Sequence, residues 1–313
     1  GWIDIPGIDP SLYFEQGRCF FTANAGEERE PGLYLAEIDP RTGEVLAPSK
    51  CIWKGSGGAY PEAPHIYRRP DGYYLLAAEG GTQYGHCITA ARSERIEGPY
   101  EACPRNPVHT HRHRIDQAVM GAGHAEFVED AEGRWWAFLL AFRVTSPFFH
   151  HLGRETFLAP MRWDKTGWPR INGGALVGER IEVDALPAAP DRHRLCDHAV
   201  EENFNRAQID PAWSFLRNPI RENYQFGDGL RLYGATDSFD DDGRPSLLCR
   251  RQQHHGVAVE VELSFAPEAG EEAGLIVFYN AAHYAALLVV NDGEGPRWQL
   301  RKRIKSLVQR QDL

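Results

Sequence analysis

One carboxylate in this sequence stands in an unusually stiff setting. Glu62 lies between two prolines in the stretch Gly57–His65, which reads Gly-Gly-Ala-Tyr-Pro-Glu-Ala-Pro-His. Because proline fixes its own φ and keeps the preceding residue extended, Pro61 and Pro64 hold the backbone on both sides of Glu62. A carboxyl group aimed by a rigid backbone could serve as a general acid. The alternative is that Glu62 is an ordinary solvated turn residue.

Glu62 opens the second of three similar units, each of which reads as short strands separated by turn residues. A four-strand unit that recurs along a chain is typical of β-propeller blades, in which the first strand lines the central axis. Asp9, Glu62 and His124 stand at or just before the first strand of their units. We therefore expect these three side chains to converge at one end of the axis. The alternative is that the three positions merely hold turn residues.

Four strands are predicted in the first unit and three in each of the other two. They cover residues 7–14, 18–22, 33–38 and 45–46, then 62–67, 73–78 and 86–91, and finally 124–128, 135–140 and 156–160. Because propellers contain about four to eight blades, three blades do not close a ring. We expect residues 1–170 to form part of a β-propeller, with the other blades outside this sequence.

After the third unit the pattern changes. Residues 171–201 are rich in Ala, Pro and charged residues and predict a linker, and residues 202–313 predict a second all-β region. Segment 257–263 alternates apolar and polar residues, as a half-buried antiparallel strand does, and a β-sandwich is the natural interpretation. The basic segment 299–303 shows no closing strand, so we expect a sandwich that is cut short. Further predicted strands cover residues 213–216, 230–234, 246–250, 273–278 and 285–290.

Composition narrows the class of ligand. The 313 residues carry a formal charge of −10, which argues against nucleic acid or an anionic membrane as a partner and favours a neutral ligand. No run of 18 apolar residues and no export signal are visible, and the six cysteines form no Cys-x-x-Cys pair. We therefore expect reduced thiols and a cytoplasmic protein. The sequence leaves the oligomeric state open, and a homo-oligomer is allowed.

Two carboxylates that face each other across a pocket, in a protein with a neutral ligand, suggest glycoside hydrolysis. In that reaction one carboxyl group protonates the leaving oxygen and another carboxylate activates water. The histidines at 109, 111 and 113 could bind a metal on a strand, but we interpret this stretch as a loop. For Trp135 and Trp136, core packing is the preferred interpretation over stacking on sugar.

Seven short stretches combine glycine, proline and charged residues in a distinctive order: Gly7–Leu12, Gly57–His65, Ala78–Thr82, Ala91–Ser93, Gly98–Tyr100, Gly123–Ala125 and His151–Thr156. Together they resemble glycoside hydrolase family 43, and most closely its β-xylosidases with an appended C-terminal β-sandwich. Arg250–His254 in the predicted sandwich agrees with that resemblance. The resemblance covers nearly the whole chain.

The resemblance implies an all-β protein, a five-bladed β-propeller followed by a concanavalin-like β-sandwich, and an inverting hydrolysis by single displacement. By motif position, Glu62 would be the general acid. Asp9 would orient Glu62 and keep the pKa of Glu62 high, because a neighbouring negative charge disfavours its ionisation. No cofactor is implied for the reaction.

Four further positions gain implied roles. Arg154, Tyr60 and His151 would contact the substrate, and a structural ion pair with a nearby glutamate is the alternative for Arg154. His124 would lie in the axial channel, where family members often hold a calcium ion or a water. The implied general base is an Asp on the first strand of the first blade, and no residue before Asp9 matches its motif.

The implied function is an exo-acting β-1,4-xylosidase or α-L-arabinofuranosidase that releases terminal pentoses from xylo-oligosaccharides or arabinoxylan fragments. The alternative is a catalytically impaired remnant that binds carbohydrate without turnover, because the general base is missing from this chain. A third hypothesis is an open set of blades that does not fold stably, since it exposes a sheet edge. The preference between xylose and arabinose stays open at this point.

Overall fold

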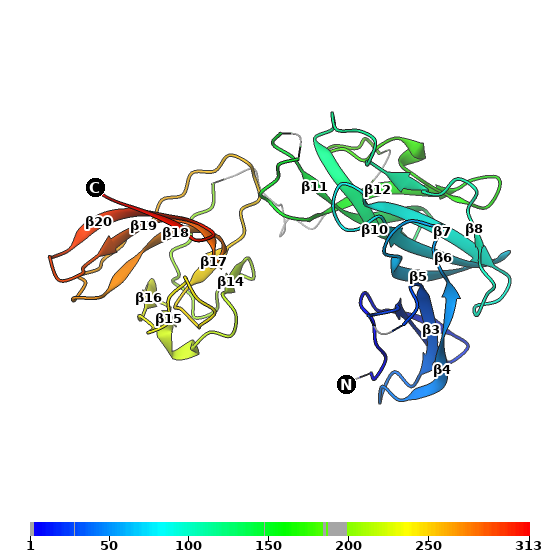
Figure 1. The fold of residues 1–313 in the computed structure, drawn as a ribbon, viewed down its shortest axis with the longest axis horizontal. Helices are drawn as coiled ribbons and strands as arrows, with labels where there is room; N and C mark the ends of the chain where they lie inside the picture. The colour runs from blue at the N-terminus through cyan, green and yellow to red at the C-terminus, as the bar shows by residue number, and fades with distance from the viewer. Residues whose placement is uncertain (1–2, 28, 147, 184–185, 187–198) are drawn as a thin grey trace. The chain divides into compact units, whose positions relative to one another are not determined.

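The protein is described here by a computed structural model that covers residues 3–27, 29–146, 148–183, 186 and 199–313. It contains two compact units, residues 1–188 and residues 189–313, which are treated separately below. Strands dominate both units (Figure 1). No helix among the described residues is long and apolar enough to cross a membrane.

The first unit consists of three antiparallel sheets, each built from consecutive strands. This confirms the three repeated units predicted from the sequence. The first sheet contains β1 (Ser11–Glu15), β2 (Arg18–Asn24), β3 (Leu33–Ile38) and β4 (Val45–Trp53). The second contains β5 (Glu62–Arg69), β6 (Gly72–Glu79), β7 (Cys87–Ser93) and β8 (Glu101–Ala102), with β9 (His109–Thr110) also paired to β7. The third contains β10 (Val119–Glu129), β11 (Trp135–Arg143), β12 (Glu155–Trp163) and β13 (Pro169–Ile171).

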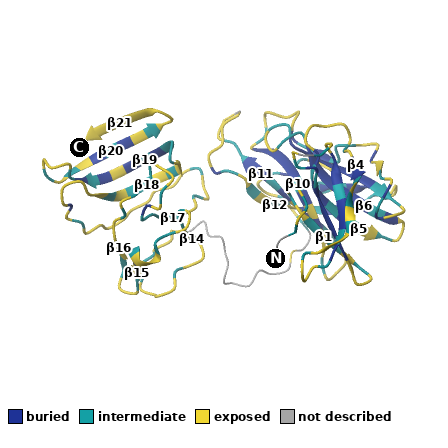
Figure 2. Cartoon of the chain, turned by 60° about the horizontal axis from the view of Figure 1, so that its bottom comes forward, coloured by how far each residue is buried: buried dark blue, intermediate teal, exposed yellow. Residues whose placement is uncertain are grey.

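The central strands are apolar on both faces because each sheet packs against a neighbouring sheet. One core connects the first and second sheets through Phe20, Leu33 and Leu75, and another connects the second and third sheets through Leu76 and Leu139. Figure 2 shows this burial as dark blue along the strands of the first unit. Full burial of each large apolar side chain contributes about 1.5–3 kcal/mol, so these faces hold the three sheets together.

The first strands of the three sheets lie side by side. Strand β5 packs against β1 and β2 on one side and against β10 on the other. Thr22 Oγ1 donates a hydrogen bond to the Pro64 carbonyl at 3.1 Å, and the Tyr67 hydroxyl accepts one from the Phe127 amide at 2.7 Å. This arrangement is the one that propeller blades require around an axis.

The end of the first unit continues past its last strand. A 3₁₀ turn, η1 (Asn172–Gly174), follows β13, and Val177 is buried in the core between the second and third sheets. Ile181 packs against the same core. The predicted linker of residues 171–201 stays a prediction, and its residues 184, 185 and 187–198 lie outside the described part of the chain.

The second unit contains a four-stranded antiparallel sheet and two small two-stranded sheets. Tyr284, Ala286 and Leu288 form its small core together with Phe239 and Ile276. The strands of the larger sheet are β18 (Glu272–Asn280), β19 (His283–Val290), β20 (Arg297–Ile304) and β21 (Leu307–Asp312). The smaller sheets pair β14 (Trp213–Phe215) with β17 (Leu248–Arg250) and β15 (Tyr224–Phe226) with β16 (Leu230–Leu232), and η3 (Arg221–Asn223) is a 3₁₀ turn.

Two strand predictions in this unit were wrong. The basic segment 299–303 lies inside β20, which pairs with β19 and β21. Arg301 in this strand is buried and forms an ion pair with Glu272 at 2.6 Å. Strand prediction from sequence expects an apolar residue at each buried position. A buried arginine that is paired with a glutamate breaks this expectation, so the strand was missed. Segment 257–263 alternates as predicted, yet it is not a strand, and Val257, Val259 and Val261 are exposed. Alternation specifies which side chains share a face but supplies no hydrogen-bonded neighbour.

Candidate active site

A β-bulge in β5 sets the position of Glu62. Glu62 pairs with Ala78 and His65 pairs with Leu76, so β5 has one more residue between these pairs than β6 has. The extra space is taken by Ala63, whose φ is 51°. Positive φ is uncommon in residues other than glycine, and bulges of this kind re-aim side chains out of the regular ladder. Glu62 therefore leaves the strand in a direction that a regular ladder would not give.

The same irregularity recurs in the other two blades. In β10 an extra residue lies between the pairs that Gly123 and Glu126 make with β11, and His124 in between has φ of 44°. Asp9, two residues before β1, has φ of 53°. Positive φ thus falls on Asp9 and His124 themselves and on Ala63, the residue that follows Glu62.

Ring contacts and electrostatic interactions show that Asp9, Glu62 and His124 lie near one another. The ring of His65 lies 6.2 Å from the ring of His124, and the His65 Nδ1 atom lies 3.1 Å from Ser11 Oγ. The charge of Asp9 acts on both His65 and Glu62. The structure therefore brings Asp9, Glu62 and His124 together, with His65 between their strands.

Glu62 is a carboxyl group whose pKa is raised. Burial raises the pKa of Glu62, and the negative charge of Asp9 raises that pKa further. Both causes favour the protonated form, since each penalises the carboxylate. The geometry thus supplies a carboxyl group that keeps its proton to higher pH than a solvated glutamate does.

Two histidines near this point were not assigned a role from the sequence. Burial lowers the pKa of His65 and of His86, so both imidazoles are neutral near pH 7. The His86 Nδ1 atom lies 3.1 Å from the Gly121 carbonyl, and the ring of His86 occupies the space that a side chain at Gly123 would need. Their sequence signals were present, because His65 ends the Pro-Glu-Ala-Pro-His stretch and His86 follows a glycine just before a strand.

The predicted substrate-binding residues separate into two groups. Arg154 donates a hydrogen bond to Thr82 Oγ1 at 3.3 Å, and its charge acts on His86. Tyr60 is 69% exposed, and its ring borders Gly81, the residue before Thr82. Arg154 and Tyr60 therefore approach the same Gly81-Thr82 turn.

His151 is exposed, and its predicted contact with the substrate stays a prediction. Its neighbour His150 stacks on Phe142 with 4.1 Å between ring centroids. The adjacent Glu155 bonds Arg143 at 2.8 Å, and the ion-pair alternative for Arg154 stays a prediction.

The histidine-rich stretch after the second blade is not the predicted loop. His109 lies in β9, and both His109 and His111 are buried. His111 Nδ1 donates to the Val119 carbonyl at 2.7 Å, so His111 Nε2 accepts bonds from the Val177 amide and from His109 Nε2, each at 3.2 Å. This network ties three segments of the fold. Among the residues that the structure describes, no group of three or more His, Cys, Asp or Glu side chains could hold a metal ion.

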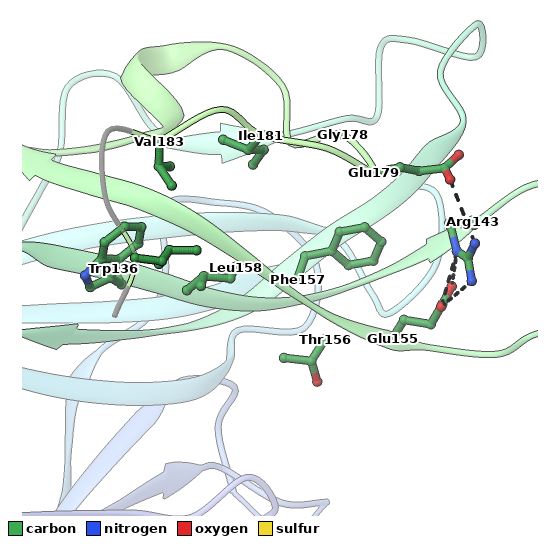
Figure 3. A pocket seen from close by; sticks show the side chains of 11 residues that line it. Trp136, Arg143, Glu155, Thr156, Phe157, Leu158, Gly178, Glu179, Ile181 and Val183 are labelled. Carbon is green, nitrogen blue, oxygen red and sulfur yellow. Dashed lines mark hydrogen bonds and ion pairs between the residues drawn. The ribbon is translucent and has the colours of Figure 1, made fainter. Parts of the chain in front are cut away.

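A hollow of about 350 Å³ lies away from Glu62, on β12 and the segment around residues 178–183 (Figure 3). Arg143 spans one end and bonds Glu155 at 2.8 Å and Glu179 at 3.8 Å. Trp136 lines the hollow, is mostly buried and donates a hydrogen bond to Asp130 at 2.9 Å, while Trp135 packs against the core. None of the predicted site residues lines this hollow.

Comparison with known proteins identifies the family of both units. Residues 1–169 match the family "Glycosyl hydrolases family 43", and residues 201–312 match "Beta xylosidase C-terminal Concanavalin A-like domain". The chain belongs to glycoside hydrolase family 43. Both the family resemblance and the predicted fold class, propeller blades followed by a concanavalin-like sandwich, are confirmed.

Named relatives include enzymes for two pentoses. The non-reducing end alpha-L-arabinofuranosidase BoGH43B of Bacteroides ovatus is 33% identical over 98% of this chain and 58% of its own length. The structure of a xylan beta-1,4-xylosidase from Bacillus halodurans has a TM-score of 0.83 at 30% identity, covering 99% of this chain and 62% of that one. A beta-xylosidase of Bacillus subtilis is 32% identical over 92% of this chain and 57% of its length. The chain spans about three fifths of the length of these relatives.

Proposed function

We propose that the whole protein is an inverting, exo-acting glycoside hydrolase that releases terminal xylose or arabinose from xylo-oligosaccharides or arabinoxylan fragments. The observation that carries this proposal is the half-buried Glu62, whose proton is retained by burial and by the charge of Asp9. A net charge of −10 suits a neutral sugar better than an anionic polymer. The names of the relatives support pentosides as the substrate class.

In the proposed reaction Glu62 donates its proton to the glycosidic oxygen while the bond from that oxygen to the anomeric carbon breaks. The negative charge of Asp9 keeps the pKa of Glu62 high until the proton is transferred. Inversion requires a second carboxylate, about 6.5–9.5 Å away, that takes a proton from the attacking water. We assign no residue of this chain to that role.

Substrate contacts in this proposal fall to Arg154, Tyr60 and His151. A guanidinium group offers several donors in a planar fork, which suits adjacent sugar hydroxyls. The exposed ring of Tyr60 borders the same turn as Arg154 and could stack on a sugar ring. Contacts of this kind position the sugar but do not choose between the two pentoses.

Beside His124 in the axial channel, we propose a bound water in preference to a calcium ion. Calcium takes about six to eight oxygen ligands, whereas the group facing His124 is the imidazole of His65. Water can donate a hydrogen bond to an imidazole nitrogen and accept one from an imidazole N–H. No step of the proposed reaction uses a metal. Cytoplasmic localisation and a homo-oligomeric state stay predictions.

The test is hydrolysis by the whole protein and its Glu62→Gln variant, with p-nitrophenyl and methyl β-D-xylosides and α-L-arabinofuranosides as substrates. Loss of the acid should lower hydrolysis of the methyl glycosides by about 10²–10⁴-fold and that of the p-nitrophenyl glycosides far less, because a good leaving group needs little protonation. Glu129→Gln, an exposed carboxylate at the far end of β10, is the matched control. Equal rates for Glu62→Gln and wild type would reject the acid assignment. Sugar binding by calorimetry without turnover in the wild type would favour the carbohydrate-binding alternative.

A further inference from the structure

A second glutamate lies close to Glu62 in the sheet and has very different surroundings. Glu79 ends β6 and is 1% exposed. Its Oε1 atom accepts hydrogen bonds from the Ser56 amide at 2.7 Å and from Thr89 Oγ1 at 2.8 Å. Its Oε2 atom accepts bonds from the Gly58 amide at 2.7 Å and from Ser56 Oγ at 3.1 Å. Four donors thus surround a buried carboxylate, and three of them come from one loop.

The loop is shaped around this carboxylate. A Cβ atom at Gly58 would lie 2.5 Å from Glu79 Oε2, and one at Gly55 would lie 3.1 Å from Glu79 Oε1. The Gly80 amide donates a hydrogen bond to the Ala59 carbonyl at 2.7 Å. The backbone from residue 55 to residue 59 therefore has no freedom to shift without losing bonds to Glu79 or Gly80.

The anchored loop leads directly to the proposed acid. Only Tyr60 and Pro61 separate Ala59 from Glu62, and Tyr60 has φ of 54° while proline has a fixed φ. We name residues 55–61 the acid loop. We propose that Glu79 is the positioning residue of the acid loop: it holds the backbone of Ser56 and Gly58 so that Glu62 is presented at the axial point. This inference deepens the proposed function and rests on it.

Two acceptor oxygens are needed at this place because four donors bond to them. In Glu79→Gln one oxygen becomes an NH₂ group, which would face two donors and leave them without an acceptor. The loop backbone would then move to find water. Thr89→Val is the matched control, because it removes one donor to Glu79 from outside the acid loop and leaves both loop amides bonded.

The first experiment needs no activity and uses the 313-residue chain. Amide hydrogen exchange at Ser56 and Gly58 and the pKa of Glu62, from NMR titration of its side-chain carboxyl, are measured in wild type and both variants. We expect Glu79→Gln to lose protection at both amides by at least tenfold and to lower the pKa of Glu62, since a displaced Glu62 becomes better hydrated. Thr89→Val should keep both properties. Unchanged protection and an unchanged pKa in Glu79→Gln would overturn the inference.

The second experiment uses hydrolysis by the whole protein. Glu79→Gln should lower kcat for methyl β-D-xyloside by about 10–100-fold, with little change for p-nitrophenyl β-D-xyloside, because only the first substrate depends on protonation. A merely structural role would lower both rates equally, and that result would contradict positioning. If Glu79→Gln does not fold, Gly58→Ala, whose methyl group presses on Glu79 Oε2, gives the same readouts. A wild type that hydrolyses neither substrate refutes the proposed function, and the exchange and titration results still decide whether Glu79 positions Glu62.

Discussion

Glu62 follows the acid loop and Glu79 anchors it from the paired strand β6, and the fold gives these two carboxyl groups very different surroundings. Glu62 pairs with Ala78, the residue next to Glu79. Glu79 is given four hydrogen-bond donors, which fix both of its side-chain oxygens in place. Glu62 is given partial burial and the negative charge of Asp9, which destabilise its carboxylate. The difference teaches that surroundings, more than residue type, decide whether a carboxyl group anchors a loop or holds a proton for transfer.

The largest expected effect is on stability at Glu79. Glu79→Ala leaves two backbone amides and two hydroxyls without their acceptor in a buried place, which should cost about 3 kcal/mol of the free energy of unfolding. Urea denaturation of the 313-residue chain at pH 7 measures it. A change below about 1 kcal/mol would mean that water replaces the carboxylate, and the contrast with Glu62 would weaken.

A buried titratable group without an oppositely charged partner should make the free energy of unfolding depend on pH. His109, on β9 in the same sheet as Glu62 and Glu79, is such a group. Burial beside His111 lowers the pKa of His109 to about 3. The unfolded chain binds a proton near pH 6.5 and the folded chain does not, so stability is lost as pH falls from about 6.5 towards 3. At pH 5 this loss amounts to about 2 kcal/mol. His109→Gln keeps a donor for His111 and should flatten the loss between pH 7.5 and pH 5 in urea titrations, whereas an unchanged slope would assign it to other groups.

Removing the charge of Asp9 tests whether that charge raises the pKa of Glu62. Asp9→Asn should lower the pKa of Glu62, because the neighbouring negative charge is lost. The alkaline limb of the kcat/KM profile of the whole protein would then move to lower pH, with about a tenfold loss of rate above that limb. The measurement is a pH profile with methyl β-D-xyloside. An alkaline limb that does not move would show that burial sets the acidity of Glu62.

The smallest expected effect is a gain in stability at Glu62. Its folded pKa lies above the unfolded value of 4.5, so its contribution to stability is present below pH 4.5 and is lost as pH rises through the folded pKa. Glu62→Gln removes that loss and should stabilise the chain at pH 7.5 by less than about 1 kcal/mol, since Glu62 is partly hydrated. At pH 4 the two proteins should be equally stable in urea. Destabilisation at pH 7.5 would mean that Glu62 has a structural role like that of Glu79.

Much of the fold was predictable from local patterns. The three blades follow from short apolar segments between Gly, Pro and Asp turns, and the repeat placed Asp9, Glu62 and His124 at equivalent positions. The structure gathers these three, which the order of the residues indicated without any pairing information. Segment 257–263 was predicted to be a strand and is not one, whereas the basic segment 299–303 was not predicted to be a strand and lies in β20. A strand exists only through its neighbours, and neighbours are a property of the tertiary structure.

The sequence by itself determined the residue types of the site, the blades that present them and the family to which the chain belongs. It did not indicate that His65 would be half-buried and His86 buried beside His124, each with a lowered pKa, or that Glu79 would receive bonds from a loop more than twenty residues earlier. Only the tertiary structure decided these points. Burial and hydrogen bonding depend on atoms brought together from distant strands, and these atoms set the charge and the position of each carboxyl group and imidazole.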